Sequence, residues 1–81
     1  MELKDKTLNQ VEKMTSTLQM ELDLIDAGAK AGMHVNTLMG EHLITITFCD
    51  QINSVAMHFI DRYCHRRKLT YWIANNKITI V

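Results

Sequence analysis

The spacing of apolar residues changes period three times along this chain, and this alternation constrains the fold more than any other feature. In residues 1–26 apolar side chains recur every three or four positions, which indicates an amphipathic helix. Beyond residue 32 they first alternate with polar residues as in strands, then return to the helical spacing, and then alternate again. The order predicts a single α+β domain in which a glycine-containing loop, residues 27–32, joins the N-terminal helix to a ββαββ unit, residues 33–81.

The first alternating stretch contains a turn signal. Gly40 and Glu41 separate two alternating runs, and a two-residue turn with glycine first is typical of a type II′ hairpin. With this turn, the antiparallel register predicts three cross-strand pairs. Because cross-strand partners lie on the same face of a sheet, the large apolar side chains would share one face of the hairpin. The predicted pairs are Thr37 with Ile44, Val35 with Ile46, and Met33 with Phe48.

The second alternating stretch contains Asn75 and Asn76, a pair that tolerates the positive φ angles of a type I′ turn. This hairpin predicts that Ile73 faces Ile78, that Tyr71 faces Ile80, and that Trp72 lies on the other face. The two hairpins together would form a four-stranded, mainly antiparallel sheet with a helix on one face. The opposite face, which carries Trp72, is left to the first helix, a second subunit or a ligand.

Between the hairpins, Asp50 is predicted to cap the N-terminus of the second helix. The apolar stripe of this helix comprises Ile52, Val55, Ala56, Phe59, Ile60 and Tyr63. Its last turns carry Arg62, Arg66, Arg67 and Lys68, the most concentrated charge in the chain. Basic residues there favour the helix macrodipole, but their number exceeds what the dipole needs. These four residues are therefore the candidate anion or nucleic-acid site, and nucleic-acid binding is our second functional hypothesis.

At 81 residues the chain is the size of one small domain, for which oligomerisation often supplies additional buried surface. We therefore expect a homo-oligomer. Nine Lys and Arg balance nine Asp and Glu, so no overall charge favours nucleic acid or an anionic membrane. Two cysteines are too few for a disulfide scaffold, and neither a signal peptide nor an apolar run of membrane-spanning length is present. These features predict a cytoplasmic protein without a transmembrane segment.

The residues that could perform catalysis or hold a metal are not arranged for either role. His58, Cys64 and His65 form the closest set of ligand types, but their offsets along a helix do not direct them to one point. No glycine-rich segment presents a nucleophilic cysteine, and the segment from Gly28 to Gly32 lacks the spacing of a phosphate-binding loop. We expect no enzymatic activity, no cofactor and no metal.

Two surfaces are predicted to bind another protein. One is the apolar stripe of the first helix, around Val11, Met14 and Leu18, which would otherwise pack within its own domain. The other is the open sheet face around Trp72. The leading hypothesis is therefore a non-enzymatic module that acts by occupying the surface of a target protein.

The whole chain resembles the small accessory proteins of T4-like bacteriophages. The resemblance lies in its size, its six methionines, its use of isoleucine, threonine and asparagine, and its lack of a catalytic signature. It implies a cytoplasmic regulator that acts by protein–protein binding, such as a lysis-timing factor of the antiholin type or an inhibitor of host defence. It assigns no role to any single residue.

Overall fold

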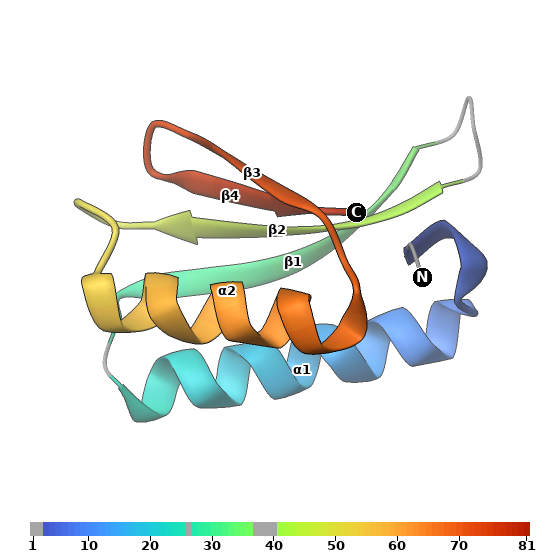
Figure 1. Cartoon of the computed structure of the whole chain (residues 1–81), viewed down its shortest axis with the longest axis horizontal. Helices are drawn as coiled ribbons and strands as arrows, with labels where there is room; N and C mark the ends of the chain where they lie inside the picture. The colour runs from blue at the N-terminus through green and yellow to red at the C-terminus, as the bar shows by residue number, and fades with distance from the viewer. Residues whose placement is uncertain (1–2, 26, 37–40) are drawn as a thin grey trace.

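Two helices lie on one face of a four-stranded antiparallel sheet, which confirms the predicted α+β fold (Figure 1). The structure is a computed structural model and describes residues 3–25, 27–36 and 41–81. Its sheet order is β1-β2-β4-β3. The elements are the 3₁₀ turn η1 at Leu3–Asp5, α1 at Leu8–Leu24, β1 at Ala29–Asn36, β2 at Glu41–Phe48, α2 at Ser54–Arg67, β3 at Tyr71–Ala74 and β4 at Lys77–Ile80.

Helix α1 begins at residue 8, which corrects the predicted helix over residues 1–26. Thr7 ends the preceding segment with a capping box: its hydroxyl accepts from the Gln10 amide at 3.2 Å, and the Gln10 side chain accepts from the Thr7 amide at 2.8 Å. The residues before this cap form η1, whose Leu3 is fully buried against the sheet. The Thr-x-x-Gln spacing is the sequence signal that places this boundary.

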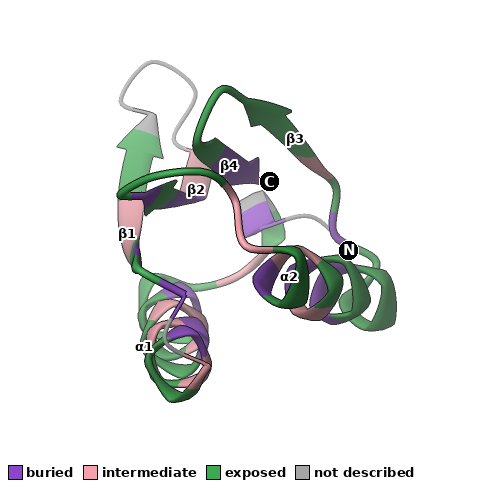
Figure 2. Cartoon of the chain, turned by 90° about the vertical axis from the view of Figure 1, so that its left-hand side faces the viewer, coloured by how far each residue is buried: buried purple, intermediate pink, exposed green. Residues whose placement is uncertain are grey.

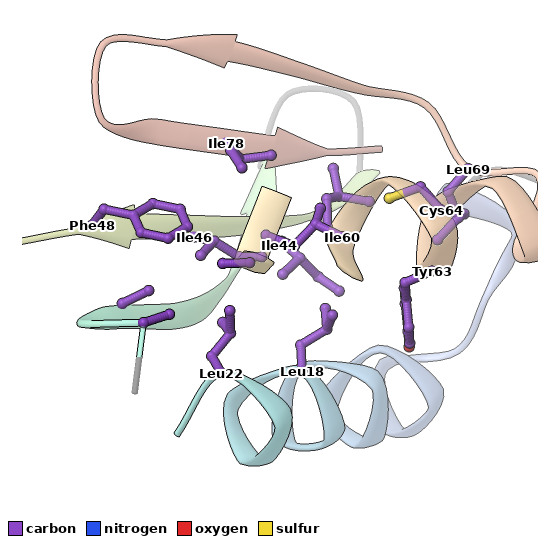
Figure 3. Close-up of a cluster of buried hydrophobic side chains, with 14 of the residues drawn as sticks. Leu18, Leu22, Ile44, Ile46, Phe48, Ile60, Tyr63, Cys64, Leu69 and Ile78 are labelled. Carbon is purple, nitrogen blue, oxygen red and sulfur yellow. The ribbon is translucent and has the colours of Figure 1, made fainter. Parts of the chain in front are cut away.

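The apolar stripe of α1 packs within its own domain. Leu18 and Leu22 point from α1 toward Ile44 and Ile46 on β2 (Figure 3), and all four side chains are essentially inaccessible to solvent. Both helices therefore share one face of the sheet, as the end-on view in Figure 2 also shows. The face that carries Trp72 is not covered by the first helix.

The predicted register of the first hairpin is wrong. Met33 pairs with Ile44 and Val35 with His42, while Glu41 belongs to β2 rather than to a turn. Gly40 and Thr37, which the prediction also used, lie outside the described residues. The observed register is shifted from the predicted one by an even number of residues, which leaves each side chain on its predicted face. The alternation of apolar and polar residues could therefore not distinguish the two registers.

Most of the predicted loop over residues 27–32 is strand, because β1 begins at Ala29. Gly28 precedes the strand with a φ of 63°, which favours glycine. Ala29 and Ala31 then lie on the face that α1 covers, and their small side chains let the helix approach the strand. The Gln19 side chain of α1 reaches both residues: it donates to the Ala29 carbonyl at 3.1 Å and accepts from the Ala31 amide at 2.8 Å.

Helix α2 begins three residues later than predicted. Asn53, not Asp50, is its N-cap, and the Asn53 side chain accepts from the amides of Val55 and Ala56 at 2.8 and 3.2 Å. The helix ends where Lys68 adopts a left-handed φ of 57° and the amide of Leu69 donates to the Cys64 carbonyl at 2.8 Å. Its buried side chains are Ala56, Ile60, Tyr63 and Cys64.

The register of the second hairpin is confirmed: Ile73 pairs with Ile78, Tyr71 pairs with Ile80, and Trp72 occupies the other face. The turn itself differs from the prediction, because Asn75 has a positive φ of 57° and Asn76 does not, whereas a type I′ turn needs a positive φ at both positions. Asn76 instead bonds to β2, since its carbonyl accepts from the amide of Phe48 at 2.8 Å.

Candidate binding groove

The two helices run in opposite directions on the same face of the sheet (Figure 1). A groove of about 470 Å³ is lined by residues of both helices. Helix α1 contributes Thr17 and Glu21 to it. The remaining lining residues come from α2, and they are Val55, His58, Phe59, Arg62, Tyr63, Arg66 and Arg67. One side of α2 therefore forms most of the groove wall, and α1 forms the rest.

An aromatic pair forms the apolar part of this groove. Phe59 and Tyr63 are one helical turn apart, with ring centroids separated by 5.9 Å and ring planes inclined by 49°. Tyr63 is buried and Phe59 is partly buried against the core. Burial raises the pKa of the Tyr63 phenol, although the nearby Arg67 charge opposes this effect. The phenol therefore remains neutral and adds no negative charge to the groove.

Three arginines line the same groove. The Arg67 guanidinium carbon lies 3.7 Å from the centroid of the Tyr63 ring, a cation–π contact that fixes one positive charge above the aromatic pair. Arg62 and Arg66 are exposed one turn apart on the same side of α2, and His58 lies one turn before Arg62. Glu21 is the single acid among the lining residues. The groove is thus predominantly positive.

Val55 is the exposed aliphatic residue of the groove lining, whereas the exposed apolar side chains in the last turns of α1 lie outside that lining. Val55, in the first turn of α2, is 59% exposed. Met20 and Leu24, in the last turns of the antiparallel α1, are 66% and 77% exposed. The end of α1 and the start of α2 lie at the same end of the molecule (Figure 1), opposite the end of α2 that carries Arg66 and Arg67.

The structure brings together three of the four predicted basic residues, Arg62, Arg66 and Arg67. Lys68 follows the helix in the left-handed region and does not line the groove. The sequence analysis missed Phe59, Thr17 and Glu21 as groove residues. The signal for part of the site was present, because Phe59, Arg62 and Arg66 recur at helical spacing along one side of α2.

The apolar stripe of the first helix, which was predicted as a partner surface, packs within its own domain. Val11 and Leu18 are completely buried, and Met14 is partly buried against the same core. These side chains stabilise the domain and are not available to a partner, because an amphipathic helix buries its apolar side against the core of its own domain. Trp72 is 51% exposed, as the prediction requires, but it lies on the opposite side of the sheet from the groove.

The open sheet face around Trp72 carries a row of threonines and two lysines. Trp72 pairs with Thr79, which pairs in turn with Thr45, and these two threonines are mostly buried. Two residues further along the strands, Lys30 and Lys77 are exposed on either side of Thr47. This face therefore presents one large aromatic ring among hydroxyl and amine groups.

The metal-ligand types remain dispersed. Cys64 is buried in the core, whereas His58 and His65 are exposed. Within residues 3–25, 27–36 and 41–81, no three His, Cys, Asp or Glu side chains gather closely enough to hold a metal ion. Neither helix of the described chain combines the length and the apolar content that a transmembrane span needs.

Comparison of the chain with protein-family models, with curated proteins and with solved structures gave no significant match.

Proposed function

We propose that this chain is a non-enzymatic module that binds an acidic, partly apolar segment of another protein in the groove between α1 and α2. The observation that carries the proposal is the joint presence of Arg62, Arg66 and Arg67 and the Phe59–Tyr63 pair in one groove. Carboxylates of a bound segment would pair with the guanidinium groups, and apolar side chains would contact the aromatic pair. The module would act by occupying the surface of its target.

The polarity along the groove supports an amphipathic protein segment over a nucleic acid. A phosphate backbone would use the arginines but would gain nothing from the exposed Val55 at the other end of the groove. An acidic helix with apolar side chains at intervals of three and four residues would use both ends. A regulatory role, such as the lysis timing or defence inhibition that the phage resemblance implies, fits a module of this kind.

A binding titration with defined probes tests the proposal. The first probe is a fluorescein-labelled amphipathic peptide of glutamate and leucine, and the others are poly-glutamate of equal length and a single-stranded oligothymidylate of equal charge. We expect the glutamate–leucine peptide to bind most tightly and to keep most of its affinity when salt is raised, because apolar contacts are not screened. Tighter binding of the oligothymidylate, with a steep loss in salt, would replace the proposal with nucleic-acid binding.

Charge reversals provide the matched control. The double variant Arg62→Glu, Arg66→Glu should weaken peptide binding by at least about tenfold, because it places two like charges where the carboxylates bind. The double variant Lys30→Glu, Lys77→Glu makes the same change in net charge on the opposite side of the sheet and should leave the affinity within about twofold. Equal losses in both variants would mean that net charge alone drives the binding and would contradict the groove as the site.

A further inference from the structure

The two edges of the sheet differ in how their backbone groups are satisfied. At the β1 edge the Gln19 side chain forms hydrogen bonds with two outward-facing backbone groups. It donates to the Ala29 carbonyl at 3.1 Å and accepts from the Ala31 amide at 2.8 Å. β3 forms the other edge, with β4 as its neighbour. Among the described residues, no side chain makes an equivalent pair of hydrogen bonds to β3. An open edge of this kind is able to accept another strand.

The ladder between β3 and β4 determines which backbone groups of β3 face outward. The amide of Val81 donates to the Thr70 carbonyl at 2.8 Å, so Thr70 directs its backbone groups toward β4. Hydrogen-bonded and non-hydrogen-bonded positions alternate along an antiparallel pair, and Trp72 therefore also bonds to β4. Tyr71 and Ile73 consequently direct their amides and carbonyls away from the sheet.

The side chains of β3 are exposed on both faces of the sheet. Trp72 is 51% exposed on the open face, and Ile73 is 48% exposed on the helix face. On the neighbouring strand, Ile78 and Ile80 are completely buried. The helical layer therefore covers β4 fully and β3 only at Tyr71, which is partly buried, so Trp72 and Ile73 remain exposed beside the outward-facing backbone.

We propose that β3 pairs antiparallel with β3 of a second copy, about a two-fold axis at Trp72, so that the two four-stranded sheets become continuous. Tyr71 would lie opposite the partner's Ile73, and each would use its outward amide and carbonyl, which gives a self-complementary interface. Trp72 would lie opposite the partner's Trp72 at a non-hydrogen-bonded position, where side chains are closest and an aromatic pair stabilises the contact. This proposal does not depend on the groove.

Neighbouring registers fit less well. If Tyr71 were opposite its own counterpart, Ile73 would face the partner's Leu69, but the Leu69 amide already donates to the Cys64 carbonyl. If Ile73 were opposite its own counterpart, Tyr71 would face the partner's Asn75, which lies in the turn with a positive φ. The register centred on Trp72 pairs both outward-facing residues of each strand within β3 itself.

Concentration dependence provides the first test. The chain has one tryptophan, so fluorescence reports on position 72 alone. We expect sedimentation to show a mass that doubles as the concentration rises, with Trp72 emission moving to shorter wavelength over the same range because the ring leaves water. A monomer at all concentrations, or a dimer that forms without a change in emission, would overturn the proposal.

The variant Ile73→Pro separates the interface from the fold. Proline lacks the amide hydrogen that Ile73 directs outward, so the β3–β4 ladder keeps its hydrogen bonds, and proline is tolerated on edge strands. The symmetric dimer would lose two hydrogen bonds, which corresponds to an increase of at least about 30-fold in its dissociation constant. A dimer of unchanged affinity in a folded Ile73→Pro variant would contradict the β3 interface.

Cross-linking tests the register and remains decisive if Ile73→Pro does not fold. In a Cys49→Ala background, Trp72→Cys would place two thiols across the axis with Cα atoms about 4.5 Å apart, within the range of a disulfide. Ala74→Cys in the same background would hold its thiols too far apart. At concentrations where the unmodified chain is dimeric, we expect mild oxidation to cross-link Trp72→Cys and not Ala74→Cys. Equal cross-linking of both variants, or of neither, would overturn the proposed register.

Discussion

The hydroxyl of Tyr71 donates a hydrogen bond of 2.6 Å to the carboxylate of Asp61, which links β3 directly to α2. This hydrogen bond raises the pKa of the Tyr71 phenol, because the neutral phenol is the donor, and burial and the Asp61 charge act in the same direction. The link also fixes the Tyr71 ring beside the exposed Ile73, at the sheet edge where we place the second copy.

Removal of this hydrogen bond should change the titration of one tyrosine and not the other. We expect Asp61→Ala to return the pKa of Tyr71 toward its ordinary value, while the pKa of Tyr63 stays raised because its main cause is burial. The two tyrosines account for the whole phenolic signal in an ultraviolet absorbance titration. An unchanged titration curve in Asp61→Ala would show that the hydrogen bond does not persist in solution.

The raised pKa values also predict the direction of alkaline unfolding. The folded chain holds the protons of Tyr63, Tyr71 and Cys64 more tightly than the unfolded chain does. Their contribution to stability is therefore complete below the unfolded pKa values and is lost as the pH rises through the folded ones. We expect the free energy of unfolding, measured with urea, to fall from about pH 9 upward. A free energy that stays constant up to pH 11 would contradict these shifts.

Gln19 should stabilise the fold through the β1 edge. Gln19→Leu keeps most of the side-chain volume but removes the hydrogen bonds to Ala29 and Ala31. We expect a loss of about 1–2 kcal/mol in the urea-derived free energy of unfolding, because both bonds are partly buried. Gln51→Leu, at an exposed position outside the helices, is the control and should change stability by less than about 0.5 kcal/mol. Equal effects of the two variants would remove the assigned role of Gln19.

Leu18 should behave as a core residue rather than as a partner contact. Leu18→Ala opens a cavity at a fully buried site and should lower the free energy of unfolding by about 3 kcal/mol. Met20→Ala, on the same helix but 66% exposed, should cost less than about 0.5 kcal/mol. Similar costs for the two variants would mean that α1 does not pack on the sheet as described.

The two cysteines should differ in reactivity. Burial raises the pKa of the Cys64 thiol to about 11, with a smaller contribution from the Asp61 charge, whereas Cys49 is exposed at the end of β2. At pH 8 we expect an aromatic disulfide reagent to modify one thiol per chain rapidly and the second only after unfolding. Cys49→Ala should abolish the rapid phase. Rapid modification of both thiols in the folded protein would contradict the burial of Cys64.

The sequence was sufficient for the fold where local chemistry and periodicity agree. The Asn75–Asn76 turn and the alternation around it predict one register, and that register is observed. In the first hairpin the same reasoning failed, because the true register differs by an even number of residues and leaves every side chain on its predicted face. Tertiary contacts that no local pattern encodes accompany the observed register. Helix α1 packs over Ala29 and Ala31, and its Gln19 side chain forms hydrogen bonds with both residues.

The candidate site was only partly predictable for a related reason. Charge density along the chain identified Arg62, Arg66 and Arg67 without any knowledge of the fold. The groove itself depends on where the second helix lies relative to the first. No local sequence pattern predicts that α1 and α2 pack on the same face of the sheet. Because the sheet buries the stripe containing Val11 and Leu18, we place the proposed partner surface on the flank of α1 beside α2.

The most direct test of the proposed function is a ¹⁵N-edited NMR titration of the whole chain with the glutamate–leucine peptide. We expect amide shifts to concentrate in residues 17–24 of α1 and 55–67 of α2, with no comparable change in β1 or β4. The Arg62→Glu, Arg66→Glu variant should lose these shifts at the same peptide concentration. Shifts confined to the open sheet face around Trp72, or no shifts at a saturating peptide concentration, would contradict the groove as the binding site.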